Sequence, residues 1–377
     1  MDFELDEDQL ALQEAAAEIL AKECPASLLR DVIDGGSQDA DLWKVLVGLD
    51  WPGMAIETDA GGSGATAVEL GLVVEQLGYV ADPSPFLATT TQFVPVVEAS
   101  TDADQRRRFL GAVAAGGCGT IAVAGPEGRW DPARPPVRAE RTADGWRLSG
   151  AAAYVIDGDR ADEIAVLAAT DSGPIAVVVP AAHAAVSRGT AYDLTLHVTT
   201  VDVTGVVVPD DRVLAVEDPA AAFTAALEVA VTGLALMTVG ACQRAFDMAL
   251  AYTKERHQFD VPIGSFQAIK HKAVDMYTRI ERARALGYFA ALCIAEGDDR
   301  RPLAAAMAKA AAGDAQHLVI RHAVQFFGGI GFTWENDLHL YLRRAKAAEV
   351  IFGGAAHHRA IVGRSVLAAG TADPTGS

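Results

Sequence analysis

The chain has 377 residues, of which 51% are hydrophobic and 7% aromatic, so it is long enough for two or three domains with a substantial core. Its 31 basic and 50 acidic residues give a net charge of −19. Such a field repels nucleic acid and anionic membranes, so the composition excludes a partner that is held by phosphate charge alone.

The sequence also indicates the cellular location of the protein. It begins with an acidic segment, Met1 to Asp8, that lacks the basic and apolar regions of a secretory signal. Residues 220–242 are apolar for long enough to span a bilayer, but Glu228 lies within them, and we expect a buried bundle helix and no membrane span. The cysteines have no zinc-ligand spacing, and we expect reduced thiols and a cytoplasmic protein. They are Cys24, Cys118, Cys242 and Cys293.

The pattern changes twice along the chain. Helical spacing of apolar residues predicts helices over 6–23 and 41–49, a third that ends near residue 79, and more helix over 86–112. Short β-branched runs then predict an antiparallel barrel or sandwich, with strands at 120–123, 146–148, 164–167, 175–179 and 198–208. Long helices follow at 219–257, 265–296, 301–327 and 336–350, with a closing helix to 367. We therefore predict three domains over 1–117, 118–216 and 217–377.

Two segments carry a specific resemblance. Tyr252 to Gln267 resembles the Y-x-x-x-R-x-Q-F-G-x-P-I-x-x-F-Q segment of the acyl-CoA dehydrogenases, and Gln325 to Thr333 resembles the Q-x-x-G-G-x-G-F turn of that family. Weaker matches extend the resemblance over roughly residues 3 to 365. It implies an α+β fold with an N-terminal helical domain, a middle antiparallel β domain and a C-terminal four-helix bundle.

The resemblance also implies a cofactor. In the family these segments contact FAD across a subunit interface, which assigns Arg256, Gln258, Phe259, Gln325, Gly328 and Gly329 to FAD binding. A guanidinium suits a pyrophosphate and a phenyl ring suits an adenine, whereas glycines let the backbone approach a ligand closely. Taken alone, the arginine could equally stabilise a helix C-terminus, with Phe259 in a core.

The segments that would hold the flavin ring depart from the family. The family's V-T-E-P-G-A-G-S-D segment corresponds to Val123 to Asp131, where Ala124 replaces the threonine and the G-S-D end is missing. The family's G-x-x-x-W-I-T-N-G segment corresponds to Gly150 to Gly158, where Ile156 replaces the threonine that would hydrogen-bond the flavin.

The family's catalytic base is missing as well. A carboxylate should remove the α-proton of the thioester while a hydride leaves to the flavin. In the family the usual base lies six residues after the lysine of an R-D-A-K segment, which Arg343 to Lys346 resembles here, and this position is Phe352. In other members the base lies about 26 residues before the motif arginine, and counting back from Arg256 gives Ala230. Glu228 is offset from Ala230 by roughly 200° on a helix and is a weak candidate. Glu349 is weaker still.

The kept and lost groups divide by role. The kept groups are those that this family lends to a neighbouring subunit's FAD, and the lost ones serve a chain's own flavin ring. The chain therefore resembles the non-catalytic member of a heteromeric bacterial acyl-CoA dehydrogenase that acts on bulky acyl-CoA thioesters such as sterol side chains. We expect an α2β2 heterotetramer with a homologous catalytic subunit.

Two alternatives stay open. The first is a self-sufficient homomeric flavoenzyme of the same fold, a dehydrogenase, oxidase or monooxygenase that uses Glu228. The second is a non-enzymatic relative without FAD.

A metal site at His357 and His358 is disfavoured because adjacent helical residues diverge by ~100° and no further ligand motif is visible, so we expect a solvated or interfacial pair.

Overall fold

The computed structural model describes residues 4–371, which fall into two compact units. The first unit is built from residues 4–29, 67–82 and 231–371, and the second from residues 30–66 and 83–230. Most of the acidic start is described, but Met1 to Phe3 and the last residues, 372–377, lie outside the described part. The order of the elements, first helices, then strands, then long helices, is the one predicted from the sequence. The three domain boundaries remain a prediction.

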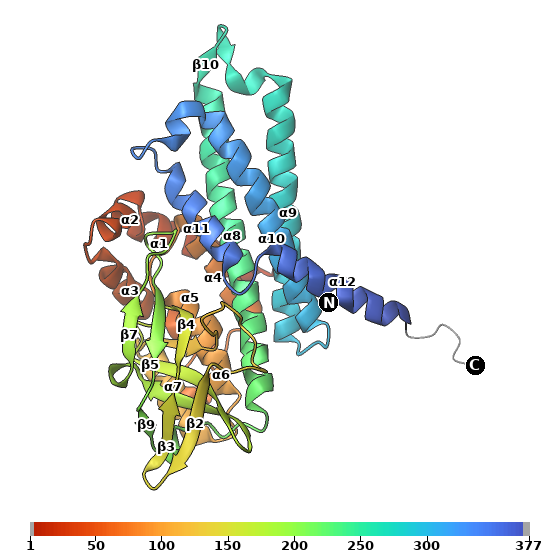
Figure 1. Ribbon diagram of the computed structural model, residues 1–377. Coiled ribbons are helices and arrows are strands. Elements are labelled where there is room, and N and C mark those ends of the chain that lie inside the picture. Colours follow the sequence, from red (N-terminus) through yellow and green to blue (C-terminus); the bar gives the residue numbers. More distant parts are fainter. Residues whose placement is uncertain (1–3, 372–377) are drawn as a thin grey trace. The chain divides into compact units, whose positions relative to one another are not determined.

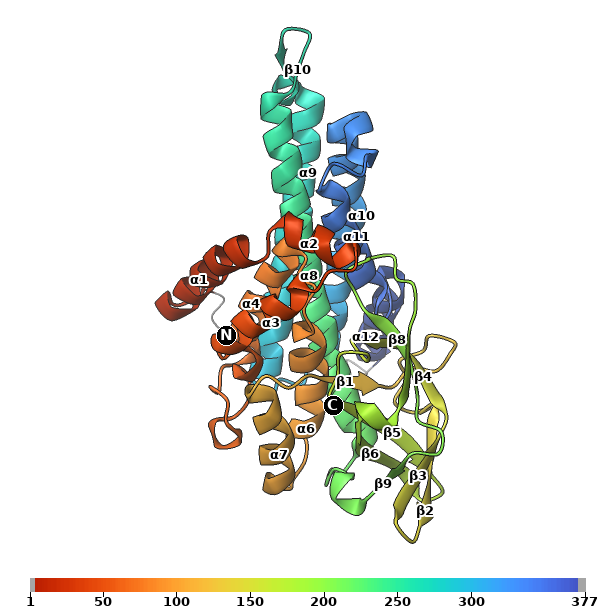
Figure 2. The same ribbon diagram turned by 90° about the vertical axis from the view of Figure 1, so that its left-hand side faces the viewer.

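The first unit is dominated by long helices that run side by side in Figures 1 and 2. Its helices are α1 (Glu7–Glu23), α4 (Ala67–Val80), most of α8 (Pro219–Glu255), α9 (Gln267–Ala295), α10 (Arg301–Phe327), α11 (Leu338–Val350) and α12 (Ala355–Thr371). A hairpin of β10 (His257–Gln258) and β11 (Val261–Pro262) joins α8 to α9, and the 3-10 turn η7 (Gly328–Phe332) follows α10. The bounds of α10 are those predicted from the sequence.

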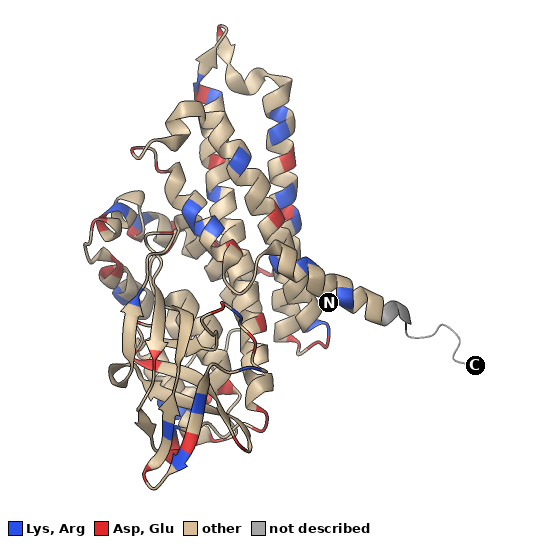
Figure 3. Cartoon of the chain, viewed as in Figure 1, with Lys and Arg blue, Asp and Glu red and all other residues tan. Residues whose placement is uncertain are grey.

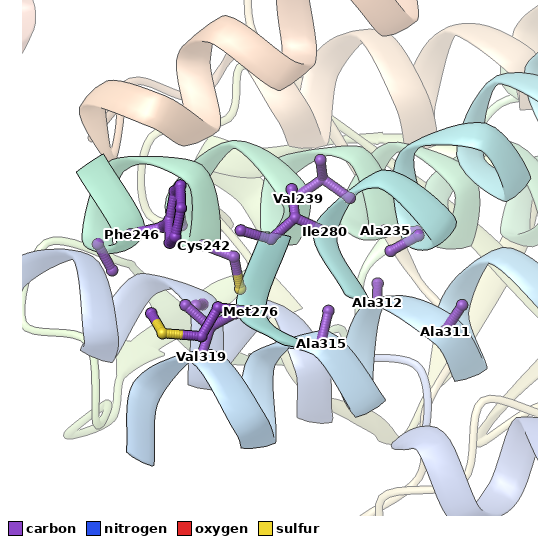
Figure 4. Close-up of a cluster of buried hydrophobic side chains, with 14 of the residues drawn as sticks. Ala235, Val239, Cys242, Phe246, Met276, Ile280, Ala311, Ala312, Ala315 and Val319 are labelled. Carbon is purple, nitrogen blue, oxygen red and sulfur yellow. The ribbon is translucent and has the colours of Figure 1, made fainter. Parts of the chain in front are cut away.

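Small side chains form the core of this helical unit. Figure 4 shows α8, α9 and α10 meeting through a cluster in which Cys242 and Met276 lie beside the alanines of α10. Alanine loses no side-chain entropy in a helix and lets neighbouring helices approach closely. The crossing of α4 and α8 is closer still, because a Cβ on Gly240 would lie 2.0 Å from the carbonyl oxygen of Glu75.

A buried ionic group joins three of these helices. Glu75 on α4 accepts hydrogen bonds from Arg284 Nε at 2.8 Å and from the Tyr288 hydroxyl at 2.8 Å, both on α9. Arg284 also donates to Gln243 on α8 at 3.0 Å. Burial, together with the nearby charge of Glu75, raises the pKa of Tyr288 well above its usual value. These contacts satisfy a carboxylate that would otherwise be costly to bury.

The second unit combines short helices with sheets. Its helices are the end of α2 (Ala26–Ile33), α3 (Gln38–Gly48), α5 (Phe86–Ala88), the π-helical segment η3 (Thr89–Phe93), α6 (Val94–Glu98), α7 (Ala103–Ala114) and the start of α8. Its strands are β1 (Gly119–Ala122), β2 (Val137–Thr142), β3 (Gly145–Ser149), β4 (Ala151–Ile156), β5 (Glu163–Thr170), β6 (Gly173–Pro180), β7 (Ala185–Arg188), β8 (Val198–Asp202) and β9 (Val207–Val208).

The strands form two sheets in this unit. One runs β1-β5-β2-β3-β9, with β6 paired to β5, and the other runs β4-β8-β7. Most pairs are antiparallel as predicted, but β1 and β2 both lie parallel to β5. Strand positions can be read from β-branched runs, whereas the direction of a non-local pair is set by the chain crossovers that bring the strands together.

Helix α8 contributes to both units. The described residues include this one helix that is long and apolar enough to span a membrane, and 67% of its most apolar 18-residue window is buried inside the chain, which agrees with the predicted core helix.

Charge is distributed unevenly along the chain: residues 1–230 have 37 acidic and 14 basic residues, whereas residues 231–377 have 13 acidic and 17 basic residues. Figure 3 shows Lys and Arg recurring along the long helices of the first unit.

Candidate functional site

The first candidate segment is the hairpin at the end of α8, near the label β10 in Figure 1. Its two turn residues, Phe259 and Asp260, have φ angles of 54° and 63°, so the turn resembles the type I′ turn of two-residue hairpins. A phenylalanine at positive φ is strained, and this side chain is 87% exposed. The chain therefore holds a large apolar ring in solvent at a backbone cost, which points to a binding role.

The second candidate segment is the turn after α10. Gly328 has φ 64° and ψ −140°, a conformation that favours glycine. Gly329 has ordinary φ, and a Cβ built on it would meet nothing within 4 Å, so the chain itself does not require a glycine there. Two aromatic side chains follow, Phe332 at 82% and Trp334 at 47% exposure. The motif contains Phe332, but the sequence alone did not single out either ring.

The two segments are brought together by a ring stack. Tyr252, one turn before Arg256, stacks on Phe327 with ring centroids 4.5 Å apart and an interplanar angle of 22°. This contact joins the end of α8 to the end of α10, so the six residues predicted to bind FAD lie in two adjoining segments of one helical unit. The resemblance to the family predicted the residues, whereas the stack that joins them was not predicted.

Charge in this region suits an anion. The Arg256 side chain is exposed and forms no salt bridge with the described residues, so its guanidinium is available to a ligand. Gln325 is also exposed. The Gln258 side-chain amide donates one hydrogen bond to the carbonyl of His257 at 2.8 Å. An exposed guanidinium, an exposed phenyl ring three residues later in the same hairpin, and an open glycine in the adjoining turn can receive a phosphate ester and a flat heterocycle.

The positions that would hold a flavin ring belong to the second unit and are apolar and buried. Ala124 is 1% exposed and its carbonyl accepts the Ala153 N–H at 2.9 Å. Ile156 is 2% exposed and its carbonyl accepts the Thr120 hydroxyl at 2.7 Å. Neither side chain offers a hydrogen bond to a ligand, because each is a hydrocarbon.

The segment after Ala124 folds back on strand β4. Trp130 forms an isolated bridge with Ala124, and its ring lies 5.8 Å from that of Tyr154. The same Tyr154 ring lies 3.2 Å from a Cβ built on Gly128, so the backbone passes directly over it. The chain's own loop therefore lies against Tyr154 of β4, which remains 45% exposed. A cavity of about 520 Å³ is lined by the loop residues Gly125, Pro126, Glu127, Arg129, Asp131, Arg134 and Pro136.

The usual base position is occupied by a buried hydrocarbon. Phe352 is 6% exposed and has φ 56°, and Gly353 follows with φ 93°. Glu349 accepts hydrogen bonds from Lys346 Nζ at 2.8 Å and from the Ala355 N–H at 2.9 Å. Burial alone would raise the pKa of Glu349, but these two donors outweigh it and lower the pKa, so this carboxylate is committed to structure.

The alternative base position remains without a carboxylate. Ala230 is 0% exposed, and α8 is continuous from Pro219 to Glu255, so the helix contains no irregularity that would rotate Glu228 onto the face of Ala230. Glu228 itself is half-buried in the second unit. Its role as a base stays a prediction of the homomeric alternative.

The two adjacent histidines differ from the expected solvated or interfacial pair. His357 is exposed, but His358 is 5% exposed and its Nε2–H donates to the carbonyl of Phe352 at 3.0 Å. Burial lowers the pKa of His358 to about 4. The expectation is wrong for His358 because the turn before α12 folds its backbone carbonyl onto the first turn of that helix.

The order of N-terminal helices, a middle β region and long C-terminal helices, together with a hairpin and a glycine turn joined at one end of a helical unit, defines an acyl-CoA dehydrogenase fold. Family models agree: the acyl-CoA dehydrogenase N-terminal domain matches residues 6–117 and the C-terminal domain matches residues 220–367. The chain belongs to the acyl-CoA dehydrogenase family.

Individual relatives place the chain more closely. It is 30% identical to acyl-CoA dehydrogenase IpdE2 of Mycobacterium tuberculosis over 90% of this chain and 91% of that protein. The ChsE4-ChsE5 complex of Mycobacterium tuberculosis contains a chain with a TM-score of 0.89 and 27% identity, with full coverage of both. A chain of the Tcur3481-Tcur3483 steroid acyl-CoA dehydrogenase, in its G363A variant, has a TM-score of 0.85 and 31% identity over 97% of this chain and 99% of that one.

Proposed function

We propose that this chain is the non-catalytic subunit of a heteromeric FAD-dependent acyl-CoA dehydrogenase. One contrast carries the proposal. Phe259, Arg256 and Gln325 stand exposed at the end of a helical unit, whereas Ala124, Ile156 and Phe352 fill the flavin-ring and base positions with buried hydrocarbon. The chain is thus equipped to hold part of a partner's cofactor and lacks the groups for chemistry of its own.

The exposed residues fit the adenine side of FAD. Arg256 would pair with the pyrophosphate, Phe259 and Gln258 would contact the adenosine half, and Gln325 with Gly328 and Gly329 would let the backbone approach the adenine. This family is FAD-dependent, and the bound flavin supplies the hydride acceptor for α,β-dehydrogenation of the thioester. In our proposal the partner subunit supplies the carboxylate and the pocket for the flavin ring.

The partner in this proposal is a homologous acyl-CoA dehydrogenase subunit, assembled with this chain as α2β2. Support comes from the structures of the ChsE4-ChsE5 complex and of the Tcur3481-Tcur3483 steroid enzyme, both similar to this chain over almost its whole length. By the same analogy we propose a bulky acyl-CoA substrate of the sterol side-chain type. The described cysteines are unpaired thiols, which supports a cytoplasmic location.

The proposal is tested by purifying the chain alone and with the acyl-CoA dehydrogenase-like protein encoded beside it, and by measuring flavin absorbance and subunit stoichiometry. We expect flavin only in the heteromer, with two flavins for four subunits. Arg256→Ala should lower the flavin content at least tenfold without dissociating the subunits, whereas Arg282→Ala, a matched change at an exposed arginine of α9, should not.

The same experiment separates the alternatives. Stoichiometric flavin and turnover in the lone chain would contradict the proposal and favour the homomeric enzyme, which Glu228→Gln would then inactivate. No flavin in either preparation would favour a non-enzymatic relative.

A further inference from the structure

A second cluster of buried ionisable groups lies where α10, α11 and α12 meet. Lys309 on α10 is 1% exposed, and its Nζ donates to the carbonyl of Ala348 on α11. Glu349, 9% exposed, follows on α11, and His358, 5% exposed, lies on α12. A lysine is rarely buried this completely without a specific partner, because its charge loses the solvation of water.

Each member of the cluster holds the backbone around the turn over residues 351–354. Lys309 fixes the last turn of α11 through Ala348, and Glu349 accepts the Ala355 N–H at 2.9 Å, which caps the first turn of α12. His358 donates to the carbonyl of Phe352 at 3.0 Å. The turn is therefore held at its start, its middle and its end by three side chains from three helices.

The backbone inside this turn is strained. Phe352 has φ 56° although it is not glycine, and Gly353 has φ 93°. Such conformations persist only where the surroundings fix them. Glycines accommodate the cluster, because a Cβ on Gly354 would lie 2.7 Å from Glu349 Oε1 and one on Gly313 would lie 3.1 Å from Glu349 Cγ.

We infer that Lys309, Glu349 and His358 are positioning residues that lock the turn over residues 351–354, together with the start of α12, in one fixed form. This turn is the one that would carry the base in the family, so the chain keeps the rigid turn although Phe352 has replaced the base. The inference goes beyond the proposed subunit role. It needs neither flavin nor partner, so its failure would leave that role standing.

The lock has a characteristic pH dependence. Burial lowers the pKa of Lys309 to about 7, against the opposing attraction of Glu349. When the turn opens, Lys309 regains its ordinary pKa, so between pH 7 and about pH 10 the open form binds one proton more than the closed form. The ratio of the closed to the open turn therefore rises with pH, approaching about tenfold per unit above pH 7, and it is lowest and constant from about one unit below pH 7 downward.

Glu349 and His358, the other two members of the cluster, leave this window to Lys309. From α11 the cluster is faced by Lys346, which pairs with Glu349 at 2.8 Å. From α12 it is faced by His357, whose ring contacts that of His358, while the nearby Arg359 pairs with Asp314 of α10 at the surface. The pKa of His358 is lowered to about 4 and that of Glu349 is also lowered, so neither group changes charge between pH 7 and pH 9.

Hydrogen exchange of the lone chain tests the lock. The peptide over residues 350–358 is followed by mass spectrometry from pH 7 to pH 9, with each rate divided by the intrinsic rate for that pH. In the wild type we expect protection to rise about tenfold per pH unit. In Lys309→Met, which keeps the length of the stem, the pH slope should vanish and protection at pH 9 should fall. Arg359→Ala, which removes only the exposed pair between α10 and α12, should keep the slope.

Two results would overturn the inference. One is wild-type protection and slope in Lys309→Met; the other is a loss of protection that spreads evenly over α9 and α10. If Lys309→Met does not fold, Glu349→Gln provides the second test. Its amide oxygen can still accept the Ala355 N–H, but the charge is gone, so we expect faster exchange confined to residues 350–358 with the slope retained. Unchanged exchange in that variant would also contradict the lock.

Discussion

Gly329 and Gly331 lie two residues apart in the turn after α10, yet the chain requires only one of them for its own packing. A Cβ on Gly331 would lie 2.9 Å from Phe327 Cβ, whereas one on Gly329 would meet nothing within 4 Å. The φ of Gly329 is not positive, so a side chain there is not strained either. The space beside Gly329 is thus available to a ligand.

This difference makes a prediction for single residues. Gly329→Ala should leave the free energy of unfolding of the lone chain within about 0.5 kcal/mol of the wild type and lower the flavin content of the heteromer. Gly331→Ala should cost about 1–3 kcal/mol in the lone chain, because the added methyl overpacks the turn. Thermal unfolding and flavin absorbance measure the two effects separately, and equal flavin content in Gly329→Ala and wild type would contradict the assignment.

Single residues were also where the sequence predicted most about the site. Arg256, Phe259 and Phe352 could be singled out because the family motifs fix their spacing. The structure shows the first two exposed and the third buried, and their roles toward FAD stay predictions. The left-handed turn at Phe259 could not be predicted, since Asp260 stands where the motif has glycine. The burial of His358 was also missed, because the hydrogen bond to Phe352 depends on how the turn folds.

At the scale of elements, the crossing of α4 and α8 depends on two glycines. A Cβ on Gly240 would lie 2.0 Å from the Glu75 carbonyl oxygen, and one on Gly78 would lie 2.3 Å from the Met237 carbonyl oxygen. Backbone atoms cannot move aside as the end of a flexible side chain can. The two helices must separate if either glycine gains a side chain.

We therefore expect Gly240→Ala to destabilise the lone chain by about 3 kcal/mol or more, at the upper end of overpacking effects. Gly363→Ala is the matched control, because this helical glycine of α12 has nothing within 4 Å of its added Cβ. It should raise stability by about 0.5–1 kcal/mol through helix propensity. Denaturant unfolding of the two variants measures the difference, and a tolerated Gly240→Ala would show that the crossing is looser than described.

Elements differed in how far the sequence predicted them. Helix α10 was predicted with its observed bounds because Gly297 and Gly328 interrupt the helical pattern on either side. The short helix α2 was missed, and so was the π-helical turn over Thr89–Phe93 inside a stretch predicted only as helix. A π turn depends on local hydrogen bonding near Pro95, which has no N–H to donate, and residue periodicity does not report it.

At the scale of the whole molecule, the lost groups form a set that one substitution cannot restore. Phe352→Glu would return a carboxylate to the usual base position, but Ala124 and Ile156 would still offer no hydrogen bond to a flavin ring. We therefore expect the heteromer with Phe352→Glu to show unchanged flavin stoichiometry and unchanged turnover per flavin. A doubling of either quantity would show that this chain retains a complete second site.

The stack of Tyr252 on Phe327 has one more consequence. It joins two segments that are 75 residues apart in the sequence, so the hairpin and the glycine turn form one structural unit. In the proposed complex, a change of ring size at Tyr252 or Phe327 would shift both the hairpin and the glycine turn. A loss of contact at one end of the adenosine half of FAD in that complex should therefore be accompanied by a loss at the other end.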